Sequence, residues 1–295
     1  MTEGGATLEE SVRQRARAKL AEADQLLRAV DEGWAPPPFD PLLVALALGI
    51  RCAPVAEPWL EDAMIFVQEG RPTILYRPER PRARTSFNIF HEIAHTLFPD
   101  YLSNPRYRHP RRPRLFEPEG RLEYLCDLAA TEFLMPMDLF SADLKASGFG
   151  AGRAEALATR YGASLEAVCL RMMEVDAESC ALVLVEPRRQ LKRGEWRELE
   201  RWMELPPQGG QRLRATYAVL SERFRREGLT FPTCLALGQR NCLDRAARSR
   251  KLVAGPERLE LGRGQSQDFY VEALPLTTHP SRRGRVPVLG FFYPR

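Results

Sequence analysis

The 295-residue sequence has little lysine, no closely spaced cysteine pair and no long apolar run. The longest apolar stretch, Leu42–Ile50, is far shorter than the ~20 residues that a membrane-spanning helix needs. The acidic N-terminal region has no hydrophobic segment of a secretory signal, so we expect a cytoplasmic protein without a membrane partner. The six cysteines form no CxxC pair, which excludes a zinc ribbon and favours free thiols.

Charge of the two signs is nearly balanced, with 43 Lys and Arg against 39 Asp and Glu and a net charge of +4. This excess is too small to make nucleic acid the expected partner. Only four of the basic residues are lysines, at positions 19, 145, 192 and 251. A coding preference for arginine explains this bias more simply than a need for its forked donors.

Hydrophobic spacing in the first part of the chain predicts helices and short strands, with a turn at 69–72. The expected helices are 8–33, 41–48, 87–98 and 121–135, and the expected strands are 51–54, 64–68 and 73–76. Residues 77–85 and 99–120 are rich in proline and arginine and predict loops. Ser86 is the expected N-cap of the helix that follows it.

The second part of the chain changes from helical to mixed character. Helices are expected at 139–146, 153–161 and 164–174, and the last two form a helix-turn-helix pattern around a glycine. Strands are then expected at 181–185, 234–237, 269–274 and 286–292, with a helix at 212–226. We therefore predict an α+β protein in three parts: a peptidase-like domain with its N-terminal helix at 1–138, a helix-turn-helix segment at 139–177, and an α+β domain at 178–295.

The strongest chemical signal is the segment from His91 to His95, which reads His-Glu-Ile-Ala-His on a predicted helix of otherwise apolar residues. Residues four apart share one helix face, so both imidazoles can bind one divalent metal. Glu92 lies one position further round the helix and can take a proton from a water beside that metal, which is the general-base role in metallopeptidases. Two hydrogen-bonded core histidines are the structural alternative.

A catalytic metal site also needs a third protein ligand and one open position. Glu123 and Asp127 share a face of the next predicted helix. Glu123 can therefore bind the metal, while Asp127 accepts the second ring N–H of a ligand histidine, most simply His91. Glu132 is the rival third ligand, and His109 lies in a loop without a helical frame.

Attack of water on a peptide carbonyl also needs a hydrogen-bond donor for the developing oxyanion. The sequence favours none of the candidates over the others; they are the loop arginines and Tyr101, Tyr107, Tyr124 and His109. The loop at 105–114 is either a clamp for an acidic substrate or a solvated flap.

Two segments, 86–98 and 123–136, resemble the ImmA/IrrE peptidase family. They share with it a helix that begins with phenylalanine and carries the HExxH pattern, and a glutamate-led helix that ends in Met-Pro. The chain departs from the commoner family pattern with Cys126 and Asp127 where Ala-Asn is frequent. The layout of the whole chain is closest to the family's radiation-response regulators of Deinococcus-type bacteria.

The resemblance implies a gluzincin-like zinc peptidase domain, a helix-turn-helix and a C-terminal GAF-like domain. It also implies zinc, or else manganese, as the metal. The implied substrate is a helix-turn-helix transcriptional repressor of the DdrO type, whose site-specific cleavage induces the DNA-damage and radiation response.

A DNA-binding transcriptional regulator with a structural metal site is the alternative. The second helix of the helix-turn-helix pattern begins with Ser164, Leu165 and Glu166 and offers only Arg171 as a forked donor. We therefore expect a structural or substrate-docking role for it, not DNA binding. The C-terminal domain either binds a small signal molecule or only packs against the peptidase, and no ligand motif favours one reading.

Overall fold

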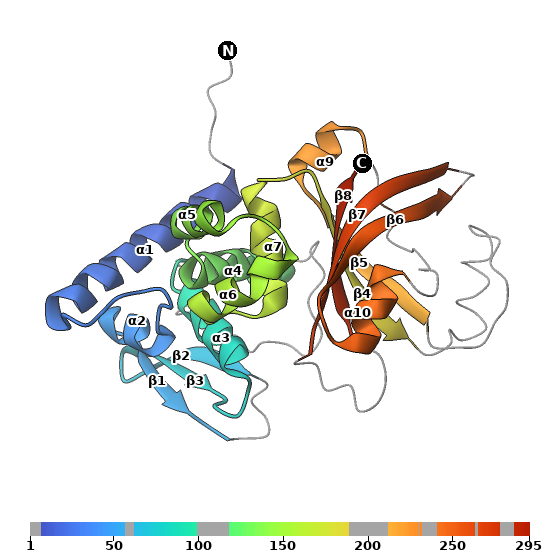
Figure 1. Ribbon diagram of the computed structural model, residues 1–295. Coiled ribbons are helices and arrows are strands. Elements are labelled where there is room, and N and C mark those ends of the chain that lie inside the picture. Colours follow the sequence, from blue (N-terminus) through green and yellow to red (C-terminus); the bar gives the residue numbers. More distant parts are fainter. Residues whose placement is uncertain are drawn as a thin grey trace, which may run out of the picture. The chain divides into compact units, whose positions relative to one another are not determined.

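The computed structural model describes residues 7–56, 62–98, 118–188, 212–229, 231, 241–262, 265–277 and 286–295. The chain divides into two compact units, one of residues 1–143 with 157–164 and one of residues 144–156 with 165–295. Figure 1 follows the elements of both units along the chain. Among the described helices, none combines the length and the apolar character that crossing a bilayer requires. The predicted domain limits at 138 and 177 stay predictions.

The first unit combines helices with a small sheet. Its elements are α1 (Leu8–Val30), α2 (Pro41–Ala47), β1 (Arg51–Pro54), β2 (Ala63–Gln68), β3 (Arg71–Tyr76), α3 (Arg82–His95) and α4 (Pro118–Leu134). Two further helices, α5 (Met137–Ser147) and α6 (Ala151–Tyr161), have residues in both units. The expected helices and strands of this part are present, within a few residues at their ends.

The three strands of the first unit lie in the order β1-β3-β2, with β1 parallel and β2 antiparallel to β3. Glu69 and Gly70 join β2 to β3, and both have positive φ, 53° and 75°. Two such residues make the turn whose twist suits a two-residue hairpin. The predicted turn is therefore confirmed. Helix α3 packs against both strands of this hairpin, β2 and β3.

The predicted N-cap of α3 is wrong. The helix begins at Arg82 with Pro81 as its N-cap, and Ser86 is buried inside the helix. The pyrrolidine ring holds Pro81 at φ −52°, close to the helical value, so the chain can enter the helix there. An ion pair between Arg84 and Asp62 ties the first turn to the segment before β2. This long-range contact extends the helix into the predicted loop.

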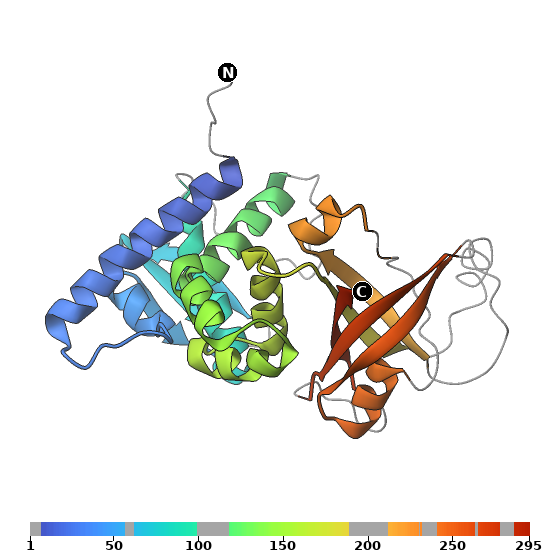
Figure 2. The same cartoon turned by 45° about the horizontal axis from the view of Figure 1, so that its top comes forward.

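The second unit carries α7 (Leu165–Val175), α9 (Glu222–Arg226) and α10 (Cys242–Ser249) with a five-stranded sheet. Its strands are β4 (Ala181–Arg188), β5 (Arg212–Leu220), β6 (Val253–Gly262), β7 (Gln265–Pro275) and β8 (Val288–Pro294). They lie in the order β5-β4-β8-β7-β6, and every neighbouring pair is antiparallel. Figure 2 shows β6 and β7 as a twisted ribbon.

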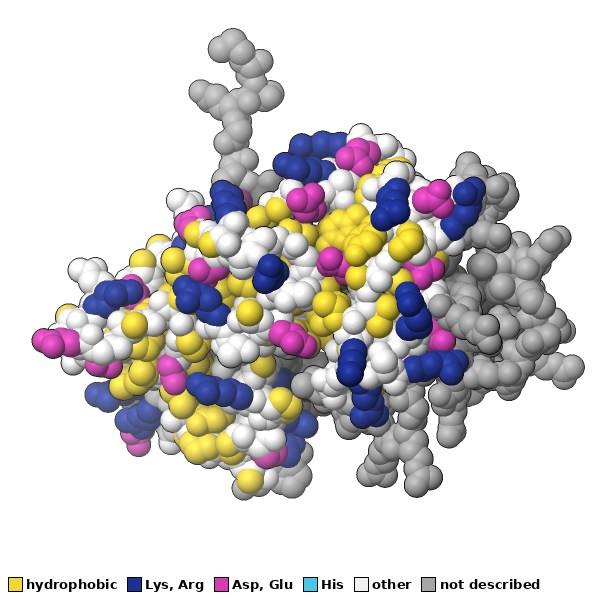
Figure 3. Space-filling view, in the orientation of Figure 1, with side chains coloured by type: hydrophobic (Ala, Val, Ile, Leu, Met, Phe, Trp, Pro, Cys, Tyr) yellow, Lys and Arg dark blue, Asp and Glu magenta, His cyan; other side chains and the backbone are white. Residues whose placement is uncertain are grey.

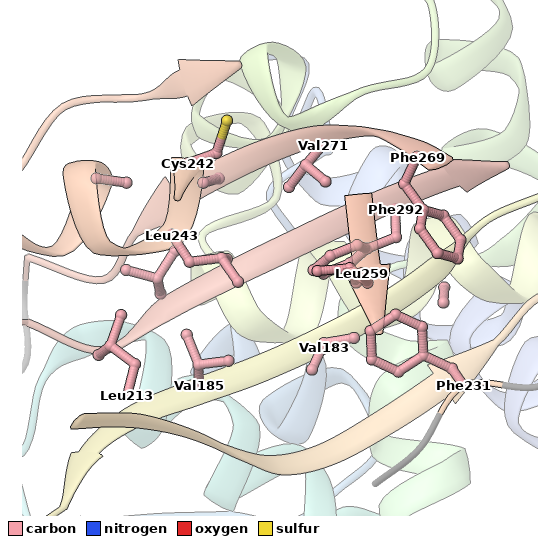
Figure 4. Close-up of a cluster of buried hydrophobic side chains, with 14 of the residues drawn as sticks. Val183, Val185, Leu213, Phe231, Cys242, Leu243, Leu259, Phe269, Val271 and Phe292 are labelled. Atoms are coloured by element: carbon pink, nitrogen blue, oxygen red, sulfur yellow. The ribbon is translucent and has the colours of Figure 1, made fainter. Parts of the chain in front are cut away.

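The core of this unit lies between the sheet and α10. Figure 4 shows Val183, Val271 and Phe292 from three strands together with Leu243 from α10. The contact is so close at Gly290 of β8 that an added Cβ would lie 2.7 Å from Leu243 Cδ2. Only glycine fits there without movement of a buried side chain.

The expected helix at 212–226 is also wrong, because β5 occupies residues 212–220 and α9 only the end. Thr216, Tyr217 and Val219 suit a strand, and pairing with β4 decides the conformation. Helix α10 is not among the predicted elements, although Asn241 is a typical N-cap. Strand β6 is also unpredicted, and its Pro256 is tolerated because β6 is an edge strand. The strand expected at 234–237 lies outside the described residues.

Charged side chains of both signs are scattered among one another on the face shown in Figure 3. This distribution agrees with the nearly balanced composition. The five cysteines in the described part of the chain are free thiols, as predicted.

Candidate metal centre

The packing of α3 against α4 positions the HExxH segment. Phe90 of α3 and Phe133 of α4 stack with ring centroids 5.7 Å apart, and both are fully buried. On the same helix the rings of His91 and His95 lie 5.1 Å apart and nearly perpendicular. Both histidines and Glu92 are buried. The four-residue helical spacing therefore brings the two imidazoles together as predicted.

Glu123 of α4 places its carboxylate beside both rings. Its Oε2 lies 3.1 Å from His91 Nε2, and its Oε1 lies 3.7 Å from His95 Nε2. Tetrahedral ligands at about 2.0–2.1 Å from one zinc ion lie about 3.3 Å from each other. The Glu123 carboxylate therefore brings one oxygen close to each imidazole nitrogen, at separations near those of ligands around one divalent metal.

Asp127 contacts the other nitrogen of His91, with Oδ1 2.8 Å from Nδ1. The structure thus brings together the pair that the sequence analysis expected. Burial alone would lower the pKa of His91, but hydrogen bonds to Asp127 and Glu123 and the charge of Glu92 raise it to about 9. Without a metal, His91 is therefore protonated on both ring nitrogens near pH 7, and it donates Nδ1–H to Asp127 and Nε2–H to Glu123.

Cys126 is the residue that the sequence analysis missed. It is fully buried, and its Sγ lies 3.5 Å from His95 Nδ1. His91, His95 and Cys126 each offer a ligand atom, and these atoms lie within 4.8 Å of one another, so this group could also bind a divalent metal. The departure from the commoner family pattern at Cys126 was the available signal.

The rival third ligand, Glu132, has a different environment. Its side chain is fully buried, and Oε1 accepts the backbone N–H of Met137 at 2.9 Å. The same oxygen lies 3.5 Å from Nη1 of Arg17 in α1. Glu132 therefore links Arg17 of α1 to the first residue of α5, Met137.

Of the expected oxyanion donors, Tyr124 lies on α4 and is 37% exposed. Tyr101, Tyr107 and His109 lie outside the described residues, as does the loop at 105–114.

The helices of the predicted helix-turn-helix pattern are present as α6 and α7, with Gly162 between them at φ +62°. Arg171, the forked donor of α7, is 1% exposed and forms an ion pair with Glu174. Glu166, near the start of α7, accepts a hydrogen bond of 2.7 Å from the hydroxyl of Tyr217 in β5. These α7 side chains are therefore engaged within the second unit.

Comparison with known proteins shows what the region around the site is similar to. A solved structure described as a Mycobacterium tuberculosis transcriptional regulator superposes with a TM-score of 0.54 at 12% identity, over 97% of this chain and 80% of its own. At that identity the likeness shows the fold alone. No curated protein matches the chain. Residues 51–173, which contain the His91–His95 segment and α4, match the family model described as the IrrE N-terminal-like domain. The match covers less than half of the chain, so it shows that this part is similar to the IrrE N-terminal-like domain.

Proposed function

We propose that the chain is a metal-dependent endopeptidase of the cytoplasm in which His91, His95 and Glu123 hold one divalent ion and Glu92 is the general base. The similarity of residues 51–173 to the IrrE N-terminal-like domain supports a metallopeptidase-like or a regulatory function. The observation that supports the peptidase best is the carboxylate of Glu123 lying within 3.7 Å of both Nε2 atoms.

Zinc suits this donor set because it is commonly bound by two histidines and one carboxylate, with a fourth position left open. When bound, the metal would polarise the scissile carbonyl and lower the pKa of a water beside it. Asp127 orients the ring of His91 through Nδ1, which leaves Nε2 for the metal. Manganese is the alternative ion and suits the carboxylate, whereas a thiolate from Cys126 would favour zinc.

Glu92 is buried and follows His91 directly in α3, which is compatible with the role of general base. It is 3% exposed, and its negative charge helps to raise the pKa of His91, which places it close to the site. In the proposed reaction Glu92 takes a proton from water as the water oxygen bonds to the peptide carbonyl carbon. The C–N bond then breaks, and Glu92 returns the proton to the leaving amine. Tyr124, Tyr101 and His109 stay candidate oxyanion donors.

The proposed substrate is a helix-turn-helix repressor of the DdrO type, cleaved at one site to induce a DNA-damage response. This part of the proposal, like a close relation to the radiation-response regulator IrrE, depends on the family resemblance. The name of the similar solved structure, a transcriptional regulator, supports a regulatory setting. A gluzincin-like first domain belongs to the same proposal. So does a GAF-like second domain that binds a small signal molecule; its antiparallel five-stranded sheet is compatible with this assignment.

The variant Glu92→Gln tests the function because it keeps the shape of the side chain and removes the base. We expect it to bind zinc like the wild type and to cleave none of the organism's helix-turn-helix repressors, as judged by mass spectrometry of fragments. Glu22→Gln, an exposed change on α1, is the matched control and should retain activity. Cleavage by the Glu92→Gln variant would refute the assigned base, and failure of wild-type protein to bind metal would refute the site.

The second candidate, a DNA-binding regulator with a structural metal, is favoured by the name of the similar solved structure. The burial of Arg171 argues against it, because this side chain cannot reach a DNA groove from inside the protein. Fluorescence anisotropy with duplex DNA at several salt concentrations separates the two candidates. Tight binding with a steep salt dependence would support the regulator.

A further inference from the structure

We propose that Cys126 is a positioning residue for His95, which holds the imidazole so that Nε2 faces Glu123. This inference rests on the proposed metal site and adds a residue that the HExxH pattern does not contain. The sulfur of Cys126 lies 3.5 Å from His95 Nδ1, and the two side chains are 0% and 4% exposed. A polar contact made in such a buried place restricts the orientation of the ring.

Neighbouring residues of α4 support the two histidines of α3 in the same way. Asp127 contacts Nδ1 of His91, and Cys126 contacts Nδ1 of His95. In each ring the nitrogen left over, Nε2, is the one that approaches Glu123. The contacts of one short segment of α4 therefore orient both rings toward one carboxylate.

The two supporting groups differ in the tautomer that they allow. A neutral imidazole can bind a metal through Nε2 only when the proton is on Nδ1. The carboxylate of Asp127 accepts and cannot donate, so it selects this tautomer in His91. The thiol of Cys126 can accept from Nδ1–H of His95 or donate to an unprotonated Nδ1. The thiol of Cys126 therefore restricts the tautomer of His95 less than Asp127 restricts that of His91.

Direct binding of the metal by Cys126 is the competing assignment, since its sulfur belongs to a group of ligand atoms within 4.8 Å. The two nitrogens of an imidazole point to different sides of the ring, so one ion cannot bind both. An ion shared by Cys126 and Nδ1 of His95 would leave the Nε2 side, where Glu123 lies, unused. The geometry therefore favours the metal on the Nε2 side and the thiol behind the ring.

The test is titration of the full-length chain with Co²⁺ against a competing chelator, followed in the visible and near-ultraviolet range. We compare wild type with Cys126→Ala and Cys126→Ser, and use Cys169→Ala as a control because Cys169 is equally buried but lies in the other unit. Loss of an outer hydrogen-bond partner lowers metal affinity about 10–100-fold when the partner is strong. Since a thiol is a weak partner, we expect Cys126→Ala to lower affinity about 3–10-fold.

The serine variant should restore most of that loss because its hydroxyl also accepts from Nδ1–H, and the control should match wild type. A sulfur-to-cobalt charge-transfer band in wild type that disappears in both Cys126 variants would show direct ligation and overturn the proposal. Unchanged affinity in Cys126→Ala would also overturn it. Absence of Co²⁺ and Zn²⁺ binding by wild type would refute the metal site itself, and this inference with it.

Nitrogen NMR of the histidines gives a readout that does not depend on the variants, and with four histidines the spectrum is simple. In zinc-loaded wild type we expect His95 to carry its proton on Nδ1. A proton on Nε2 of His95 would overturn the proposal even if the alanine variant fails to fold.

Discussion

Replacing Asp127 with alanine removes an acceptor that lies 2.8 Å from Nδ1 of His91. Two effects on metal binding follow, and they have opposite signs at neutral pH. The ring loses the partner that strengthens it as a ligand. It also loses a hydrogen bond that raises its pKa, so a proton competes less strongly for the site.

The size of each effect can be worked out from the structure. A hydrogen bond to a charged group contributes about 1.5–3 kcal/mol, and solvent weakens this one because the Asp127 side chain is 48% exposed. We therefore expect a loss near 1.4 kcal/mol, or about tenfold in affinity. With a pKa of about 9, His91 in wild type holds its proton at neutral pH. Metal binding must displace that proton, at a cost of roughly 100-fold near pH 7.

The assay is zinc competition with a chelator between neutral pH and about pH 9.5. In wild type the affinity should rise about tenfold per pH unit and level off near the pKa of His91, about 9. Above that pH Asp127→Ala should be about tenfold weaker than wild type, and near pH 7 the difference should shrink. Asp127→Asn, which keeps an acceptor without charge, should lie between them. Equal affinity of Asp127→Ala and wild type above pH 9 would refute the role of this contact.

Three further outcomes are expected. Glu132→Ala should lower the free energy of unfolding by roughly 2 kcal/mol because it removes a buried acceptor, and it should leave zinc affinity unchanged. Glu123→Ala should lower zinc affinity and leave the free energy of unfolding unchanged. Calorimetry and zinc titration check both variants, and lost zinc affinity in Glu132→Ala would make Glu132 the ligand. Gly290→Ala should destabilise the second unit by about 1–3 kcal/mol in chemical denaturation, because the added Cβ meets Leu243, and unchanged stability would contradict the packing. Burial raises the pKa of Cys180 to about 12, so alkylation of the native protein near pH 8 should spare this thiol. The contribution of Cys180 to stability should be constant below about pH 8.5 and fall as pH rises toward 12. Rapid alkylation of Cys180 in the native protein would contradict this.

The site could be predicted from the sequence where the chemistry is local. His91 and His95 are one helical turn apart, and Glu123 and Asp127 repeat that spacing on α4, so their faces follow from helical geometry. That these faces meet depends on the packing of α3 against α4, which the need for a third ligand and the family resemblance suggest but helical geometry alone does not determine. The departure from the commoner family pattern singles out Cys126, but helical periodicity does not tell which neighbour of Asp127 meets His95, so the contact itself could not be predicted.

The failures in the fold have a common cause in contacts between distant residues. Residues 212–220 contain arginines and alanines that suit a helix, and only pairing with β4 makes them a strand. In the same way, α3 begins earlier than predicted because Arg84 in its first turn pairs with Asp62, a residue more than twenty positions before it. Local signals were sufficient in α1, where apolar residues recur at helical spacing and Thr7 caps the first turn.

The central claim is that His91, His95 and Glu123 together hold one divalent ion. X-ray absorption at the zinc edge of the zinc-loaded protein tests it most directly, with Glu123→Ala measured beside the wild type. We predict a first coordination sphere of nitrogen and oxygen only, at about 2.0–2.2 Å, with two imidazoles in wild type and weakened binding in the variant. Sulfur at about 2.3 Å, or a spectrum unchanged by Glu123→Ala, would contradict the claim.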